Sequence, residues 1–189
     1  MNLPNKLTML RVLMIPVFLL FFHVRAIPWH TLWALLVFAA ASVTDCLDGQ
    51  IARRRGLITD FGKFMDPLAD KVLVMTAVLC FVGERLVPAW AAALILAREL
   101  AVTGLRTLAA GAGRVLAADK WGKLKTVTQM VWVLYGLLLI WITESFDLGY
   151  AAPAWLYGVF LGLMLLVLLA TVGSGANYLY RNRELFADR

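Results

Sequence analysis

Apolar residues fill six long stretches of the chain, separated by short polar connections. The stretches LTMLRVLMIPVFLLFF and AWLYGVFLGLMLLVLLATVG, for example, hold one charged residue between them. About 20 helical residues cross a hydrocarbon core roughly 30 Å thick, so such stretches are typical of membrane-spanning helices. The pattern predicts six of them, at residues 7–22, 29–51, 64–82, 89–108, 126–143 and 154–179.

Six spans leave no room for a separate soluble domain. We therefore expect an all-α bundle, one membrane domain over residues 1–189, with a polar cavity that faces the cytoplasm. The composition agrees, because 62% of the 189 residues are hydrophobic, 16% are charged and the mean hydropathy is +0.80. A secretory signal is the alternative for the first stretch, but no small-residue cleavage site follows it.

Positive charge is distributed unevenly between the two sides of the predicted bundle. Of the 18 Lys and Arg residues, only Arg25 and Arg85 fall in the three connections on one side. The positive-inside rule then places the termini and the basic connections in the cytoplasm. Orientation in a bilayer accounts for the net charge of +6, and we expect no nucleic-acid partner. Tryptophans near helix ends on the other side resemble interfacial anchors: Trp29, Trp33, Trp90, Trp141 and Trp155.

The cysteines and histidines do not predict a site. Cys46 and Cys80 both fall inside apolar helices, which favours buried thiols over a disulfide framework or a zinc site. His23 and His30 lie on the side that carries little positive charge, away from the acidic residues considered next.

Four aspartates flank the bend between the second and third predicted helices. Asp45 and Asp48 precede the bend, and Asp66 and Asp70 follow it. Spacings of three and four residues place each pair on one face of its helix. At 1.5 Å per residue the two pairs have similar depths, so a hairpin can bring them together near the cytoplasmic interface.

Four unpaired carboxylates there would be very unfavourable. Their free-energy cost in the membrane would total about 10 kcal/mol, even when a lower cost near the interface is taken into account. Protonation of the carboxylates would lower this cost, and so would ion pairs with Arg53–Arg55 or Lys71. Hard divalent cations are the third possibility: all-oxygen ligands favour magnesium or manganese, and two ions would cancel four charges. Paired ions suit displacement at phosphorus. Helix-end ion pairs without catalysis, and an ion or proton pathway, stay open as alternatives.

The residues between the aspartates are suited to a phosphate ligand. Gly49 and Ala52 leave the second helix bare, Arg53 carries a planar fork of donors, and Gly62 permits close approach before Asp66. In a membrane helix, small residues also serve packing.

Together these residues form the pattern Asp45-x2-Asp48-Gly49-x2-Ala52-Arg53-x8-Gly62-x3-Asp66-x3-Asp70. It resembles the signature of the CDP-alcohol phosphotransferase family at every fixed position. The segments LPNKLTMLR, AREL-x-VTGLR and GKLKT-x-x-Q are most similar to members whose acceptor is sn-glycerol 3-phosphate.

The resemblance implies transfer of a phosphatidyl group from CDP-diacylglycerol to an alcohol, with release of CMP, in phospholipid biosynthesis. Serine, inositol phosphate and phosphatidylglycerol are alternative acceptors. It also implies two magnesium or manganese ions, contact with membrane lipids, a homodimer, and a multi-pass protein of the bacterial cytoplasmic (inner) membrane.

Residue roles follow by position in the signature. Asp45, Asp48 and Asp66 would bind metal, and Asp70 would bind the second metal and act as the catalytic base. The CDP-lipid would lie along Asn5, Thr8, Gly49, Ala52, Arg53, Thr59 and Gly62.

The acceptor's phosphate needs cations on the same side. We expect these from the fourth and fifth helices, at Arg98, Arg106, Lys123 and Lys125. The alternative is that these charges only orient the chain, and that Arg98 is paired with the adjacent Glu99.

Overall fold

Six α-helices make up the part of the chain that the structure describes. The computed structural model describes the backbone of residues 3–55, 60–111, 120–146 and 153–181, with side chains except at 3–8, 45–55, 60–68, 70, 108, 110–111 and 120. In these ranges there is no strand. The helices are α1 (Leu3–His23), α2 (His30–Arg55), α3 (Asp60–Gly83), α4 (Ala89–Gly111), α5 (Lys120–Ser145) and α6 (Ala154–Arg181).

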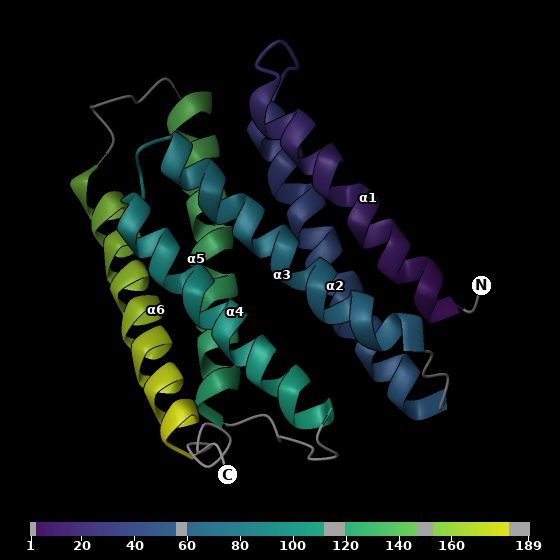
Figure 1. Cartoon of the computed structure of the whole chain (residues 1–189). Coiled ribbons are helices and arrows are strands. Elements are labelled where there is room, and N and C mark those ends of the chain that lie inside the picture. Colours follow the sequence, from purple (N-terminus) through teal and green to yellow (C-terminus); the bar gives the residue numbers. More distant parts are fainter. Residues whose placement is uncertain (1–2, 56–59, 112–119, 147–152, 182–189) are drawn as a thin grey trace.

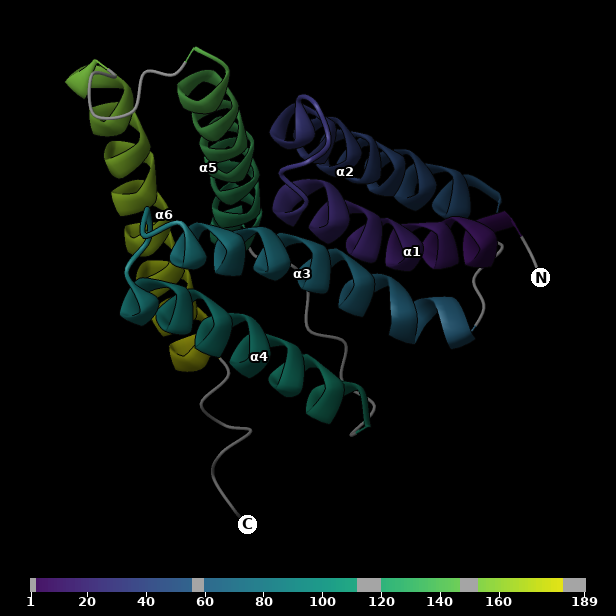
Figure 2. The same ribbon diagram turned by 90° about the horizontal axis from the view of Figure 1, so that it is seen from above.

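Successive helices run in opposite directions. The N-terminal ends of α1, α3 and α5 and the C-terminal ends of α2, α4 and α6 lie at one end of the bundle, called the lower end below (Figure 1). Seen from above, α1 and α2 lie side by side, α5 and α6 form a second pair, and α3 runs between the pairs with α4 beside it (Figure 2). Segments far apart in sequence therefore lie at the same end of the bundle (Figure 1).

Aromatic side chains fill the space between α3, α5 and α6. The ring centroids of Phe81, Trp132 and Phe160 lie 5.5–5.9 Å apart, and all three side chains are buried. This contact requires Gly136, because a Cβ there would lie 2.6 Å from a Phe81 ring carbon. The missing side chain lets α5 approach both rings, as small residues do at helix contacts in membranes.

The outer surface is apolar where a soluble protein would be polar. On α6, Leu161, Leu165, Leu169 and Val172 are exposed, Leu169 to 70%. Among the described residues, the helices at Trp121–Ser145 and Ala154–Arg181 are long and apolar enough to cross a bilayer, and shorter apolar helices cover Met9–His23, His30–Thr44 and Lys71–Gly83. Such a surface suits lipid as its solvent. The full count of six crossings stays a prediction.

All six predicted helices are present, and several extend beyond their predicted ends at the lower end. The second ends at Arg55 rather than Ile51, the third begins at Asp60 rather than Phe64, and the fifth begins at Lys120 rather than Thr126. Apolar runs mark the lipid-facing part of a helix, whereas its backbone hydrogen bonds continue into the polar segment. The polar signature is therefore helical on both sides of the bend.

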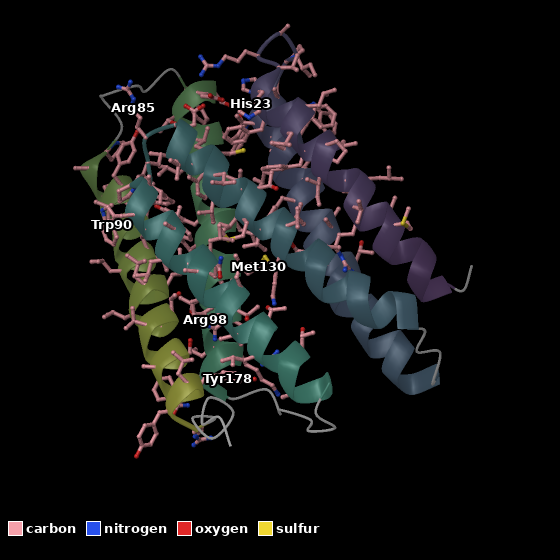
Figure 3. All side chains as sticks on the ribbon, viewed as in Figure 1. His23, Arg85, Trp90, Arg98, Met130 and Tyr178 are labelled. Carbon is pink, nitrogen blue, oxygen red and sulfur yellow. The ribbon has the colours of Figure 1, made fainter. Side chains whose placement is uncertain are left out.

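The opposite, upper end holds both histidines, because His23 ends α1 and His30 begins α2. Figure 3 shows His23 and Trp90 in the upper half of the bundle. His30 contacts the Phe21 carbonyl oxygen through Nδ1 at 3.2 Å and Glu144 through Nε2 at 3.5 Å. Trp29, Trp90 and Trp155 are more than 60% exposed, as expected of interfacial anchors. The histidines thus lie at the end opposite the predicted site.

Candidate functional site

The aspartates of the signature lie on two helices that contact each other and run in opposite directions. Asp45 and Asp48 are on α2, and Asp66 and Asp70 are on α3. Asp45 lies ten residues before the end of α2, and Asp70 lies ten residues after the start of α3. Both are therefore about 15 Å from the end of the helix next to the bend. Asp48 and Asp66 lie seven and six residues from the same ends.

The side chains of these aspartates are outside the part described, so their convergence stays a prediction. The backbone places the two pairs at similar distances along neighbouring helices from the ends next to the bend, which the hypothesis requires. Gly49, Ala52 and Arg53 follow on the last turns of α2, and Gly62 lies on the first turn of α3. Asn5 and Thr8 lie on the first turns of α1, also at the lower end (Figure 1). Thr59 falls outside the described residues.

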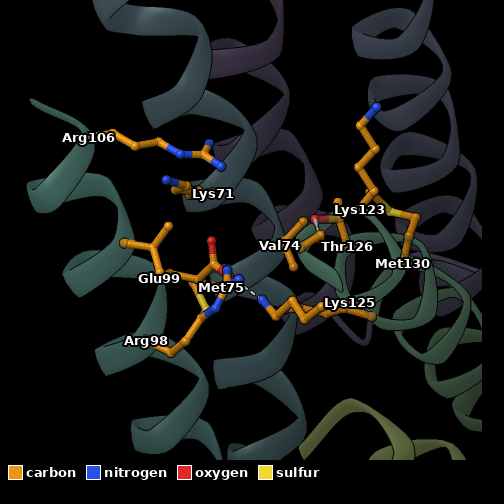
Figure 4. A pocket seen from close by; sticks show the side chains of 13 residues that line it. Lys71, Val74, Met75, Arg98, Glu99, Arg106, Lys123, Lys125, Thr126 and Met130 are labelled. Atoms are coloured by element: carbon orange, nitrogen blue, oxygen red, sulfur yellow. Dashed lines mark hydrogen bonds and ion pairs between the residues drawn. The ribbon is translucent and has the colours of Figure 1, made fainter. Parts of the chain in front are cut away.

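The predicted acceptor cations line a single pocket. A cavity of about 260 Å³ lies between α3, α4 and α5, and its walls include Arg98 and Arg106 of α4 and Lys123 and Lys125 of α5 (Figure 4). Lys71 of α3 completes the cationic lining, and Glu99 is the one acidic residue among the described lining residues. Five cations and one carboxylate make a pocket for an anion.

Glu99 holds two of the cations. Its Oε1 accepts a hydrogen bond from Arg98 Nη1 at 2.9 Å and another from Lys125 Nζ. The side chains of Arg98, Glu99 and Lys125 are only 12%, 14% and 1% exposed. The predicted Arg98–Glu99 pair is therefore present, and Lys125 joins it. Buried charges need such partners, because desolvation of an unpaired ion is costly.

Arg98 passes through a narrow space between α5 and α6. Its Nη2 donates to Ser174 Oγ at 3.0 Å. A Cβ at Gly175 would lie 3.3 Å from Arg98 Cγ, and a Cβ at Gly122 would lie 3.7 Å from Nη2. Arg98 Nε is buried and has no hydrogen-bond acceptor among the described residues. The guanidinium is thus held in one direction.

The other cations of the pocket differ in exposure and in the direction of their side chains. Lys123 is exposed and extends away from the Arg98–Glu99 pair, whereas Lys125 is buried and reaches toward it (Figure 4). Arg106 is exposed, and its guanidinium carbon lies 5.7 Å from the centre of the Tyr178 ring. The structure thus brings the four predicted residues together but gives them different surroundings.

Lys71 is a pocket residue that the sequence did not assign to the acceptor. Its Nζ donates to Thr103 Oγ1, and Thr103 Oγ1 donates to the Glu99 carbonyl oxygen at 2.7 Å. This link ties α3, directly after Asp70, to the α4 wall of the pocket. The available signal was a lysine next to the last signature aspartate at the start of an apolar helix. For Glu99 the sequence predicts only the pair with Arg98.

The chain belongs to the CDP-alcohol phosphatidyltransferase family, whose model matches residues 1–172. The matched range includes the whole signature, and it includes the pocket residues of α4 and α5.

Relatives that carry one enzyme name are similar to the chain over most of its length. A CDP-diacylglycerol–glycerol-3-phosphate 3-phosphatidyltransferase of Bacillus subtilis (strain 168) is 40% identical over 97% of this chain and 96% of its own. Proteins of the same name from Pseudomonas fluorescens and Escherichia coli (strain K12) are 38% and 43% identical, over 82% and 71% of this chain and 91% and 77% of their own.

Proposed function

We propose that this chain transfers the phosphatidyl group of CDP-diacylglycerol to sn-glycerol 3-phosphate and releases CMP. The product would be phosphatidylglycerophosphate, so the chain would act as a phosphatidylglycerophosphate synthase in phospholipid biosynthesis. The observation that carries the proposal is the cationic pocket next to the helix that bears Asp66 and Asp70. Family membership and the name shared by the relatives support it.

The lining of the pocket fits a small, doubly charged acceptor. Its volume of about 260 Å³ is slightly below the roughly 300–1,000 Å³ of pockets for drug-sized ligands. Arg98 and Arg106 offer planar forks of donors, which suit phosphate oxygens. Serine lacks the phosphate that would use these cations, and phosphatidylglycerol is far larger.

Asp70 is our proposed general base. It immediately precedes Lys71, which lines the pocket, so the acceptor's hydroxyl could lie between the cations and the carboxylate. The hydroxyl oxygen would bond to the β-phosphorus of the donor, and the bond from that phosphorus to the bridging oxygen would break. The hydroxyl proton would pass to Asp70, and CMP would leave with the bridging oxygen.

The donor would lie along the last turns of α2 and the first turns of α1 and α3. We assign Arg53 to its diphosphate, Gly49, Ala52 and Gly62 to close approach, and Asn5, Thr8 and Thr59 to the nucleotide. All of these except Thr59 are on helix ends at the lower end of the bundle (Figure 1). A lipid-linked nucleotide would reach this end from the membrane surface.

The family generally depends on divalent cations. The chemistry of the donor set fits magnesium or manganese. The four residues supply only carboxylate oxygens, from adjacent helices and at similar distances from the ends next to the bend: Asp45, Asp48, Asp66 and Asp70. Two such ions would neutralise the diphosphate and stabilise the leaving CMP.

We further propose one membrane domain over residues 1–189 with six crossings. The lower end, which holds the site, would face the cytoplasm of a bacterial inner membrane, and the protein would be a homodimer in contact with lipid. The positive-inside pattern supports the orientation. The family resemblance is the basis for the homodimer.

An acceptor panel tests the proposal. Purified protein in detergent micelles receives magnesium, CDP-diacylglycerol and one acceptor, and CMP release is measured for glycerol 3-phosphate, serine, inositol phosphate and phosphatidylglycerol. We expect glycerol 3-phosphate to give the highest kcat/KM. A higher kcat/KM with another acceptor would refute the assignment, and no CMP release with any of them would refute phosphatidyl transfer.

A further inference from the structure

We propose that the last three turns of α6 position the two arginines of the pocket, with Ser174 acting on Arg98 and Tyr178 acting on Arg106. This inference rests on the proposed function. Neither residue falls within residues 1–172, the range that the family model matches. Neither lines the pocket, so each would act through an arginine and not by contact with substrate.

The buried stripe of α6 changes its chemistry where it reaches the arginines. Along the upper part of the helix the stripe consists of Leu156, Phe160, Met164, Val167 and Leu168. It continues with three hydroxyl residues, Thr171, Ser174 and Tyr178. Two of these three residues contact the arginines of the pocket directly, Ser174 through its hydroxyl and Tyr178 through its ring.

Ser174 is only 2% exposed and makes two hydrogen bonds. Its hydroxyl accepts from Arg98 Nη2 at 3.0 Å and donates to the Thr171 carbonyl oxygen at 3.3 Å. Next to it, Gly175 provides the room in which the stem of Arg98 lies. With Glu99 on Nη1 and Ser174 on Nη2, the guanidinium plane is held from two helices. Such a held fork needs less ordering when a phosphate binds.

Tyr178 contacts Arg106 with the face of its ring. The guanidinium carbon of Arg106 lies 5.7 Å from the ring centre, within the range of a cation–π interaction. The ring is itself fixed, because Tyr178 is 5% exposed and packs with Val102 and Leu105 of α4 in a small buried cluster. Figure 3 shows Arg98 and Tyr178 in the lower half of the bundle. A fixed ring would hold an otherwise exposed arginine near the pocket.

The geometry links acceptor affinity to the end of α6. Ser174 and Tyr178 are four residues apart, one helical turn, and Arg98 and Arg106 are eight apart, two turns. The two contacts therefore join α6 to α4 at two levels of the pocket wall. Loss of either contact would leave the donor site on α1, α2 and α3 unchanged but make an acceptor-binding arginine less ordered.

Steady-state kinetics of purified variants test the inference. Tyr178→Leu keeps a buried apolar side chain but removes the ring face, and we expect it to raise the KM for glycerol 3-phosphate about five-fold. Tyr178→Phe keeps the ring and should stay within about two-fold of the wild type. Ser174→Ala, which should still fold, tests the Arg98 contact and should raise the same KM about three-fold. The KM for CDP-diacylglycerol should not change.

Phe160→Leu is the control for general loosening of α6. Phe160 is buried in the same stripe but lies about four turns before Ser174 on α6. We expect this variant to lower the melting temperature without a selective change in the acceptor KM.

Two results would overturn the inference. The first is an unchanged acceptor KM in both Tyr178→Leu and Ser174→Ala, and the second is a rise in the donor and acceptor KM together in these variants. If Tyr178→Leu does not fold, an unchanged acceptor KM in Ser174→Ala is sufficient to overturn the inference. A wild-type protein without turnover would instead refute the proposed function, and the inference with it.

Discussion

Replacing Glu99 by glutamine removes the one carboxylate among the described residues of the cationic pocket. Glu99 Oε1 accepts from Arg98 Nη1 at 2.9 Å and from Lys125 Nζ, and all three side chains are at least 86% buried. The variant keeps the size of the side chain and one acceptor oxygen. It therefore tests the charge and not the packing.

The expected loss of stability follows from this geometry. At 2.9 Å and an effective dielectric constant of about 20, the gross attraction of one such pair is about 6 kcal/mol. Desolvation of both ions offsets much of this, and removal of one partner from a buried pair typically costs about 3–5 kcal/mol. We expect about 3 kcal/mol, because glutamine still accepts a hydrogen bond and Ser174 still accepts from Arg98.

Thermal unfolding in detergent micelles measures the effect. For a chain of this length, 1 kcal/mol corresponds to about 2–4 °C, so the melting temperature of Glu99→Gln should fall by about 6–12 °C. The matched control is Glu84→Gln, whose partner Arg25 is 3.8 Å away with its side chain 75% exposed. Exposed pairs contribute little, so this control should remain within about 2 °C of the wild type.

A double variant identifies the cause. Lys125→Met removes the most buried cation, and in the Glu99→Gln background it should recover at least about half of the lost melting temperature. If Glu99→Gln melts within about 2 °C of the wild type, or if the two changes simply add, Glu99 does not compensate a buried charge.

Three further predictions concern the metal site and the core. Asp70→Asn should retain binding of CDP-diacylglycerol and lose at least about a hundred-fold in kcat, as expected on loss of a general base; near-normal turnover would remove Asp70 from that role. Chelation by EDTA should abolish CMP release, and added magnesium or manganese should restore it; full activity in EDTA would contradict a metal-dependent site. Gly136→Ala should lower the melting temperature by about 4–8 °C, because its Cβ would lie 2.6 Å from Phe81 Cζ, whereas Gly158→Ala, with nothing within 4 Å, should not. Equal melting temperatures of these two variants would contradict the proposed close packing.

The helices could be predicted from the sequence because lipid burial demands long apolar runs. Each of the six runs became a helix. The ends at Arg55, Asp60 and Lys120 were missed, because beyond the apolar run a polar segment has no hydropathy signal that separates helix from loop. The signature could be predicted for another reason. Its aspartates are three or four residues apart within each pair, so helical spacing alone places each pair on one face of its helix.

The pocket could be predicted only in part. Arg98, Arg106, Lys123 and Lys125 were recognisable as cations on the correct side, but their surroundings depend on contacts across the fold. Ser174 lies 76 residues from the arginine that it contacts. A single serine or tyrosine at the end of an apolar helix does not reveal such a partner, because the relative placement of α4 and α6 depends on packing of the whole bundle.

The most direct test of the central claim is transfer of labelled sn-glycerol 3-phosphate into lipid by the purified wild-type protein. With CDP-diacylglycerol and magnesium, the label should enter the lipid extract as phosphatidylglycerophosphate, in equal amount to the CMP released. CMP release without label in the lipid, or no reaction at all, would contradict the account.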